Sequence, residues 1–453
     1  HNNIDVTVIE QSDTLGGSWK SNWKDKYWVE NAPRVLFRSG VHMKFLQDVG
    51  MEESDFKTVY GNMFQTYAFL FEFFMDHLSM HDIFQVIQGC IHYTFHDDDS
   101  KTLDEWITEK NISQTGERGL AIFSITLNDV PKNTNAKAFF NTLGLSSGGG
   151  LIQMTEPNKW HEQIECQLEG RVTFLKNTIV KGLEWDENTE RVRACQCMDA
   201  LHATSFQIEA DTFVLCTQSS GIESILKGSH VRIQNNWGNL NDFQHWNMKT
   251  HYHGFGFQLH FQEKVDTPDK WCWACQNDWT IIVLKVSDWL KTPSLDPSIQ
   301  TVWSCVVTDM NTKSKRIGKS LNECNRDEAL DECMYQLKYM HNTIPTPYHI
   351  STGVGLKKQD GTWVSQNTGF TKSNQHYLPM KGDIENVAAL GCFTDTGVDQ
   401  VASMMAAVES SATYLNTYEP HMVGFHIQEN GYSKWFVLFI FIVCIIFYLR
   451  YKQ

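Results

Sequence analysis

Short runs of β-branched and aromatic residues alternate with polar residues at several places along the chain. Residues 4–10 read IDVTVIE, and similar runs lie within residues 171–183 and 208–217. A period of two with many Val, Ile and Thr side chains is typical of β-strands. These runs therefore predict short strands, and the amphipathic pattern of residues 160–168 predicts a helix before them.

Two longer regions lie between these runs and have different patterns. Residues 63–91 carry Phe, Met and Leu at helical spacing, and Thr102 followed by Glu105 forms a capping box that opens another helix. Residues 255–261 and 280–285 alternate in the manner of strands. We therefore expect the first region to be largely helical and the second to form a sheet.

Glycines after the first strand point to a ligand. Residues 10–19 read EQSDTLGGSW, which is an acidic strand end followed by a polar turn and the pair Gly16-Gly17. In a dinucleotide-binding βαβ unit, the acid after the second strand accepts hydrogen bonds from ribose hydroxyls. Glu10 suits this role. The glycine pair lets the backbone pass close to a cofactor, because glycine has no Cβ.

A second glycine turn lies near the other end of the chain. Residues 386–391 (NVAALG) predict a strand and a turn, and residues 400–412 (QVASMMAAVESSA) predict a helix rich in small residues. The free N–H groups and the positive dipole end at a helix N-terminus favour electron-rich ligand atoms. Small side chains would let a ligand approach this helix closely.

The ordered set of motifs resembles the FAD-dependent amine oxidase and phytoene desaturase superfamily. It extends from the acidic strand end, through the turn, helix and strands of residues 148–217, to the C-terminal glycine turn and helix. The resemblance implies an FAD cofactor whose adenine is contacted by the backbone at Val180 and whose flavin lies beside the C-terminal helix. The cofactor-binding residues that it implies are Glu10, Gly16, Gly17, Ser18, Val180, Gly391, Cys392, Ser403 and Met404.

The chain departs from the superfamily pattern at positions that normally touch the cofactor. Ser18 stands where members usually have Arg, and Cys392 stands where they have an acid. Met405 and Ala406 replace a Glu-Gly pair. Amine oxidases place an aromatic residue at the position of Ser403, so the serine favours a desaturase-like reaction or an unusual substrate.

The resemblance also implies an α/β fold with two interleaved domains. A Rossmann-like FAD-binding domain would contain residues 1–40, 145–225 and 380–420, and an α+β substrate domain would contain residues 41–144 and 226–379. Only nine residues precede Glu10, whereas a dinucleotide-binding unit begins with a strand, a glycine loop and a helix. We therefore expect about 25 to 35 residues of this first βα unit to be missing from the sequence.

An apolar run ends the chain. Residues 435–449 read WFVLFIFIVCIIFYL, without a charged or strongly polar side chain, and Arg450 and Lys452 follow. A membrane-spanning helix needs about 20 apolar residues with aromatic and basic side chains at its ends. We expect a single-pass C-terminal anchor at residues 433–450, with the main domain in the cytosol. A buried core helix is the alternative.

Composition and charge argue against several other classes of protein. The chain has 453 residues, 42% of them hydrophobic, which suffices for two domains. Its formal net charge is −15 and it has no long Lys/Arg cluster, so we expect no nucleic-acid binding. Cys272 and Cys275 lack a second pair at zinc-binding spacing, and His251 and His253 lack a third ligand, so no metal site is predicted.

These inferences favour an enzyme whose FAD removes a hydride from a C–H or C–N bond of an amine or of a lipophilic polyene or isoprenoid. The alternative is a non-catalytic protein like the GDP dissociation inhibitors, which share this fold and bind prenylated GTPases without using flavin. The absence of the usual charged residues at Ser18 and Cys392 would then reflect the loss of a cofactor site. No catalytic residue is predicted, and Lys285 is expected to be solvated rather than to serve as the lysine that amine oxidases place near the flavin.

Overall fold

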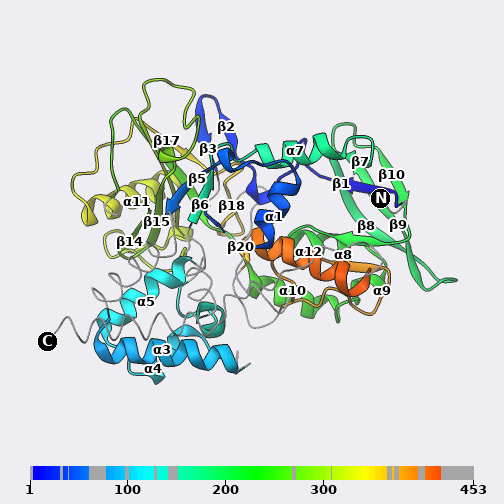
Figure 1. Ribbon diagram of the computed structural model, residues 1–453, viewed down its shortest axis with the longest axis horizontal. Helices are drawn as coiled ribbons and strands as arrows, with labels where there is room; N and C mark the ends of the chain where they lie inside the picture. Colours follow the sequence, from blue (N-terminus) through cyan, green and yellow to red (C-terminus); the bar gives the residue numbers. More distant parts are fainter. Residues whose placement is uncertain are drawn as a thin grey trace.

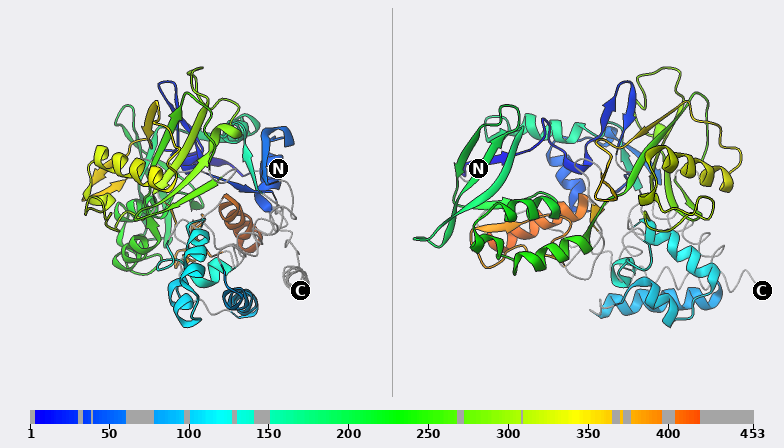
Figure 2. Two further views of the ribbon diagram at one scale, coloured as in Figure 1. Left: turned by 90° about the vertical axis from the view of Figure 1, so that its left-hand side faces the viewer. Right: turned by 180° about the vertical axis from the view of Figure 1, so that it is seen from behind.

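The computed structural model describes residues 4–30, 34–38, 40–60, 78–96, 101–126, 130–140, 151–267, 272–307, 309–364, 370–371, 377–395 and 404–419. They form three regions (Figures 1 and 2): parallel strands with an antiparallel sheet, a second antiparallel sheet, and a group of helices. The predicted anchor at residues 433–450 lies outside the described residues. Within them, no helix has the length and apolar character needed to cross a bilayer.

Parallel strands join segments that are far apart in the sequence. β1 (Val6–Ile9) pairs with β7 (Val172–Leu175), and β11 (Phe213–Leu215) pairs with β21 (Val387–Ala389). Each strand lies within a run whose pattern predicts one. Strands in a parallel pair end at the same edge, and ligands of α/β folds bind outside such carboxyl ends.

A three-stranded antiparallel sheet continues this region and has the order β10-β9-β8, with bounds Ser205–Glu209, Arg191–Asp199 and Thr178–Asp186. The covering helices are α8 (Ser219–Lys227), α9 (Val231–Gln234) and α10 (Leu240–Thr250). Gly182 of β8 lies against the end of α8, where a Cβ would be only 2.2 Å from the carbonyl oxygen of Gly228. Glycine is therefore required for this close approach.

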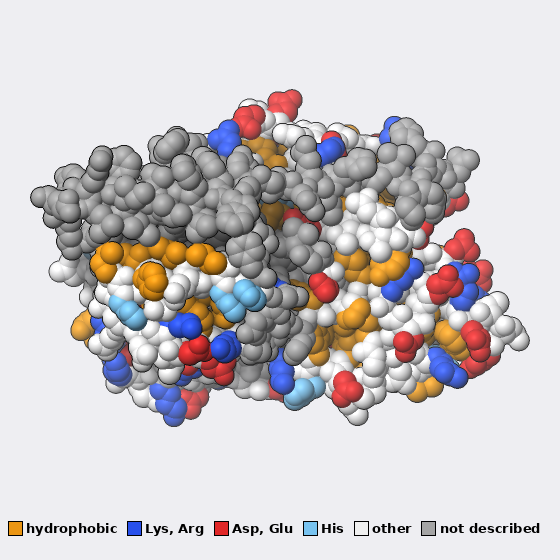
Figure 3. All heavy atoms as spheres, turned by 60° about the horizontal axis from the view of Figure 1, so that its bottom comes forward, with side chains coloured by type: hydrophobic (Ala, Val, Ile, Leu, Met, Phe, Trp, Pro, Cys, Tyr) orange, Lys and Arg blue, Asp and Glu red, His pale blue; other side chains and the backbone are white. Residues whose placement is uncertain are grey.

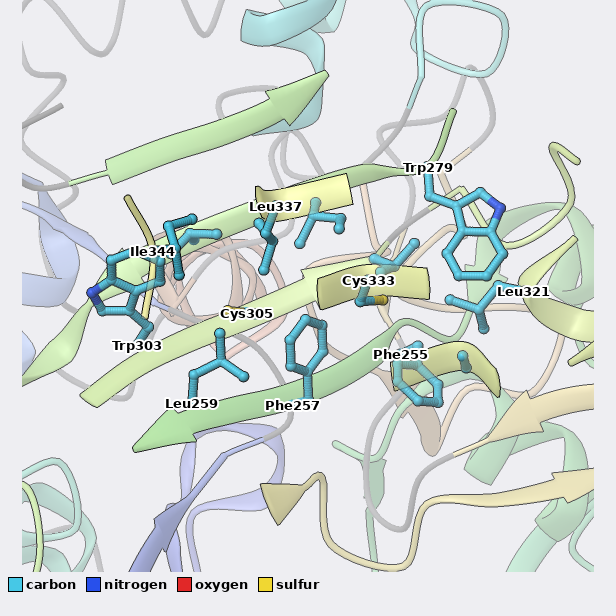
Figure 4. Close-up of a cluster of buried hydrophobic side chains, with 14 of the residues drawn as sticks. Phe255, Phe257, Leu259, Trp279, Trp303, Cys305, Leu321, Cys333, Leu337 and Ile344 are labelled. Carbon is cyan, nitrogen blue, oxygen red and sulfur yellow. The ribbon is translucent and has the colours of Figure 1, made fainter. Parts of the chain in front are cut away.

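The second sheet has five antiparallel strands in the order β14-β15-β16-β13-β17, with bounds Cys272–Gln276, Thr280–Lys285, Thr301–Val307, Phe255–Phe261 and His349–Thr352. One face packs against α11 (Arg326–Met340) through Phe257, Cys305, Leu337 and other buried side chains (Figure 4). On the opposite face, Gln258 lies beside Ser304 and Ser351 on the neighbouring strands. The sheet predicted for this part of the chain is therefore present. Its second face also carries Leu284 and Val302, which pack in an apolar cluster with Trp28.

The helical region contains α3 (Met80–Phe95), α4 (Leu103–Glu109) and α5 (Gln114–Thr126). The predicted capping box is confirmed, because the Thr102 hydroxyl accepts from the backbone N–H of Glu105 and the Glu105 carboxylate accepts from the N–H of Thr102 at 2.8 Å. Asp82, buried in α3, accepts hydrogen bonds from the N–H and hydroxyl of Ser113 and so joins α3 to the start of α5.

Three further helices position the predicted cofactor residues: α1 (Val41–Asp48), α7 (Lys159–Leu168) and α12 (Met404–Tyr418). Shorter elements complete the described chain, namely the sheet β4-β6-β5 (Leu36–Phe37, Leu151–Met154, Phe56–Tyr60) and the pairs β2-β3 (Asn22–Lys24, Tyr27–Val29), β12-β20 (His251–Tyr252, Phe370–Thr371) and β18-β19 (Lys357–Gln359, Thr362–Val364).

Candidate cofactor site

The acid predicted to hold a ribose lies at the carboxyl end of β1. The Glu10 carboxylate accepts a hydrogen bond from the N–H of Ser12 at 2.8 Å, and the Glu10 carbonyl accepts from the N–H of Thr178 at 3.0 Å. Thr178 begins β8, so Val180 follows two residues later on the same strand. The structure thus places the two residues predicted for the adenosine half of FAD on neighbouring strand ends.

The predicted glycine turn has the backbone conformation that requires glycine. Gly16 and Gly17 have φ angles of 108° and 52°, and the N–H of Trp19 donates to the carbonyl of Gly16 at 2.8 Å. Ser18 is half-buried within the resulting turn. Among the described residues other than Gly16 and Ser18, no atom lies within 4 Å of the position that a Cβ would take on Gly17, so none of them blocks a ligand from the backbone there.

Gly16 is covered on one side by His161 of α7. A Cβ on Gly16 would lie 2.7 Å from Cδ2 and 3.1 Å from Nε2 of the imidazole. His161 is buried, and neither ring nitrogen has a hydrogen-bond partner among the residues that the structure describes. Burial lowers its pKa to about 4, against a smaller opposing effect of Glu165. The ring is therefore neutral at pH 7.

Arg34 holds the same turn from another side. Its guanidinium donates to the carbonyl oxygens of Trp19 and Lys20, the latter at 2.9 Å, and lies 5.7 Å from the centre of the Trp19 ring. Burial lowers the pKa of Arg34, and the charge of Glu30 opposes this shift. Burial likewise raises the pKa of Glu30, and Arg34 opposes that shift. The two charges therefore attract each other, although in the described part of the chain no ion pair joins them and Arg34 is only half-buried.

Glu30 also links the turn to the second sheet. The side-chain amide of Gln258 in β13 donates to the carbonyl oxygen of Glu30 at 2.6 Å. The Glu30 Oε1 and Gln258 Oε1 atoms are buried without a hydrogen-bond partner in the described part of the chain. Hydrogen bonds thus join Arg34 to the glycine turn and Glu30 to the second sheet.

At the other predicted motif, the glycine turn after β21 is fixed to α12. The N–H of Gly391 donates to the Ser410 hydroxyl at 3.0 Å, and the hydroxyls of Thr394 and Ser410 lie 2.6 Å apart. A Cβ on Gly391 would lie 2.5 Å from the ring of Phe393. Cys392, the next residue, is half-buried.

Met404 of α12 and Trp19 of the first glycine turn share one apolar cluster. Met404 is buried in a cluster with Met43 and Leu46 of α1, and the partly buried rings of Trp19 and Trp160 pack against this cluster. Two predicted motifs that are separated by almost the whole chain thus lie together. Ser403, the other residue predicted on this helix, lies outside the described residues.

Sequence reasoning missed His161, Arg34 and Glu30, and it misjudged Lys285. Lys285 is buried and its ammonium lies 2.7 Å from Asp266 and 3.2 Å from Asp288. It is therefore neither solvated nor free to act at a flavin. No group of three or more His, Cys, Asp or Glu residues in the described ranges is arranged to hold a metal.

The described residues fit an FAD molecule. At one end of the candidate site, the Glu10 carboxylate can accept hydrogen bonds from ribose hydroxyls. In the middle of the site, the Gly16-Gly17 turn has no described side chain close to Gly17. At the other end of the site lie the first described turn of α12 and the turn at Gly391. Ser18 and Cys392 provide no charge where the superfamily has one, so fewer ionic contacts to the cofactor are expected.

Comparison with solved structures agrees with this fold. The chain is similar to an oxidoreductase from Methanosarcina mazei (TM-score 0.61, 11% identity, 91% of this chain and 94% of that one). It is also similar to a putrescine oxidase variant with a redesigned cofactor site (TM-score 0.58, 11% identity, 90% of this chain and 92% of that one). A third similar structure is a protein from Exiguobacterium sp. 255-15 provisionally named a protoporphyrinogen oxidase (TM-score 0.53, 12% identity, 92% of this chain and 93% of that one).

At these identities the similarity shows a common fold and not a common activity. The chain therefore has the α/β fold of flavin amine oxidases across about 90% of its length. No protein-family model and no curated protein matches the sequence.

Proposed function

We propose that the chain is an FAD-dependent oxidoreductase that removes a hydride from a C–H or C–N bond of an amine or of a lipophilic polyene or isoprenoid. The observation that carries the proposal is that Trp19 of the Gly16–Trp19 turn packs against the apolar cluster that contains Met404 of α12. This cluster brings together two motifs that lie near opposite ends of the chain.

In this proposal, Glu10 and the backbone at Val180 hold the adenosine, and Gly16, Gly17 and Ser18 pass close to the middle of the cofactor. Gly391, Cys392, Ser403 and Met404 hold the flavin end. Residues 1–40, 145–225 and 380–420 form the FAD-binding domain, and residues 41–144 and 226–379 form the substrate domain. The C-terminal anchor at residues 433–450 attaches the protein to a membrane, with the main domain in the cytosol.

Bound flavin would accept the hydride, and the chain's own residues would hold the reacting groups in place. Arg34 fixes the turn after the glycine pair through the Trp19 and Lys20 carbonyls. Glu30 and Gln258 each have a buried acceptor oxygen without a partner among the described residues. Because these side chains are buried, bulk water is largely excluded there.

The second candidate is a binding protein of this fold without a cofactor, comparable to a GDP dissociation inhibitor. The neutral residues Ser18 and Cys392 favour it. The glycine conformations at Gly16 and Gly17 favour the enzyme, because a turn that holds no ligand has no need of open backbone at Gly17.

The test is the visible absorption spectrum of the protein expressed from its complete coding sequence, with FAD added during purification. Flavin bands that bleach with dithionite are expected. Glu10→Ala should weaken FAD binding by about tenfold, the value of one hydrogen bond to a charged group. Asp13→Ala, a nearby exposed acid, is the matched control and should bind FAD normally. A folded, colourless protein that takes up no FAD would favour the binding protein.

A further inference from the structure

The side chain of Asn158 binds the backbone of Ser21. Its amide oxygen accepts from the N–H of Ser21 at 2.8 Å, and its amide nitrogen donates to the carbonyl oxygen of Ser21, also at 2.8 Å. The two residues are 137 positions apart in the sequence. An amide carries both a donor and an acceptor, so this one side chain satisfies both backbone groups of a buried residue.

Asn158 immediately precedes α7 and occupies the position that usually caps a helix. An Asn at this position commonly accepts a hydrogen bond from a backbone N–H of the first helical turn, which stabilises the helix. The Asn158 side chain makes no such bond to α7. Its amide is directed to Ser21, so the residue holds a distant segment and not its own helix.

Ser21 ends a segment whose backbone is held by side chains from elsewhere. Arg34 donates to the carbonyl oxygens of Trp19 and Lys20, and Asn158 binds both backbone groups of Ser21. These three consecutive residues directly follow the ones proposed to pass close to the middle of the cofactor. Side chains from two distant segments therefore fix the path of the chain as it leaves the glycine turn.

The start of α7 is itself fixed to other parts of the chain. The ammonium of Lys159 lies 2.5 Å from the Asp55 carboxylate, and the N–H of Thr155 donates to the Asp55 carbonyl at 2.8 Å. The N–H of Lys291, between β15 and β16, donates to the Thr155 carbonyl at 3.0 Å. The Asn158 amide is therefore held by a support that does not depend on the glycine turn.

Charge offers FAD little additional attraction at this turn. Ser18 provides no charge at the position where the superfamily usually has Arg, and the chain as a whole has a formal net charge of −15. On the described part of the face in Figure 3, acidic and basic side chains are intermixed and form no basic patch. With fewer ionic contacts, a larger share of the affinity comes from backbone N–H groups, which bind only in the right conformation.

We propose that Asn158 is a positioning residue for FAD, because it holds the backbone after the glycine pair in the conformation that binds the cofactor. This inference rests on the proposed function, since it assigns Asn158 a role toward FAD. Without the Asn158 amide, the free protein would adopt the binding conformation only part of the time, and the apparent affinity would fall by that fraction. The loss of two neutral hydrogen bonds predicts a fall of about tenfold.

Asn386 provides a matched control. Its amide also pairs with both backbone groups of one residue, accepting from the N–H of Val192 at 3.2 Å and donating to the Val192 carbonyl at 2.8 Å. This pairing lies at the amino end of β21, whereas ligands of α/β folds bind outside the carboxyl ends of the strands. Asn386→Ala should therefore lower the stability of the fold without changing the affinity for FAD.

The test is isothermal titration of FAD into the apoprotein expressed from its complete coding sequence, with chemical denaturation of each variant alongside. FAD should bind Asn158→Ala about tenfold more weakly than the parent and should bind Asn386→Ala as the parent does. Asn158→Asp keeps the acceptor, loses the donor and places a carboxylate against the Ser21 carbonyl oxygen. It should also bind FAD more weakly, and it replaces Asn158→Ala if that variant does not fold.

Three outcomes would overturn the inference. Equal FAD affinities of the parent and the Asn158 variants would do so and leave the proposed function standing. Equal losses of affinity in the Asn158 and Asn386 variants would show that binding follows the stability of the fold and not the position of the turn. A folded parent protein that takes up no FAD would overturn both the inference and the proposed function.

Discussion

Ser410 in α12 accepts a hydrogen bond at 3.0 Å from the backbone N–H of Gly391, which follows β21. Ser410 is fully buried, and its hydroxyl also lies 2.6 Å from that of Thr394. One side chain thus fixes the glycine turn to the helix that would face the flavin. This contact explains how a turn without regular secondary structure can keep a defined position.

Ser410→Ala should lower the free energy of unfolding by about 1 to 3 kcal/mol, because a buried N–H and a buried hydroxyl lose their partner. Chemical denaturation measures the change. Ser411→Ala is the control, since this exposed hydroxyl only donates to the Ala407 carbonyl of its own helix. Its effect should stay within about 0.5 kcal/mol. Equal effects of the two variants would show that the contact with Gly391 adds no stability.

The strands, the helices and the glycine turns could be predicted because their signals are local. A period of two identified β1 and β13, and the capping box at Thr102 identified the start of α4. The role of Ser410 could not be predicted. Its small size suggested only close packing, whereas its hydrogen bond depends on a turn nineteen residues away.

Contacts between distant segments were likewise invisible in the sequence. His161 follows the pattern of an amphipathic helix, and nothing local shows that its ring covers Gly16. Glu30 and Lys285 are charged residues that a pattern assigns to the surface, yet both are buried against groups from other segments. Burial of a charge depends on its partner, and the partner is chosen by the fold.

Gly16→Ala should destabilise the turn by about 1 to 3 kcal/mol, because a Cβ would meet the His161 ring at 2.7 Å and the φ of 108° is unfavourable for alanine. Adding His161→Ala should recover part of this loss, since it removes the clash but not the backbone strain. Chemical denaturation of the single and double variants tests the coupling. Strictly additive effects would mean that the ring moves aside without cost.

Arg34→Met should destabilise the protein by about 1 to 3 kcal/mol, because the Trp19 and Lys20 carbonyls lose their donor and the Glu30 carboxylate loses an attracting charge. The double variant Glu30→Gln, Arg34→Met should be more stable than Arg34→Met alone. Both variants should bind FAD more weakly than the parent, since the Trp19 and Lys20 carbonyls lose their donor. If the double variant is the less stable one, the charge of Arg34 does not stabilise the Glu30 carboxylate.

Acid should destabilise the protein through its buried histidines. Burial lowers the pKa of His161 to about 4 and that of His260 to about 3, the latter with a smaller contribution from His349. An unfolded chain takes up these protons near pH 6.5, whereas the folded chain does not. The stability contributed by each neutral ring is therefore complete above about pH 6.5 and is lost as the pH falls toward the folded-state pKa.

Between about pH 7 and pH 5, each ring should account for a loss of roughly 2 kcal/mol. His161→Gln should remove the loss of stability in acid that is due to His161 and leave the loss that is due to His260. The free energy of unfolding would then fall less steeply as the pH is lowered. His245→Gln, at an exposed position, should keep the parental slope. The same variants also test the site, because FAD bound beside Gly16 would bury His161 further. Since the folded-state ring is already neutral between pH 7 and pH 5, this would show only below about pH 5, where added FAD should steepen the pH dependence of the parent but not that of His161→Gln.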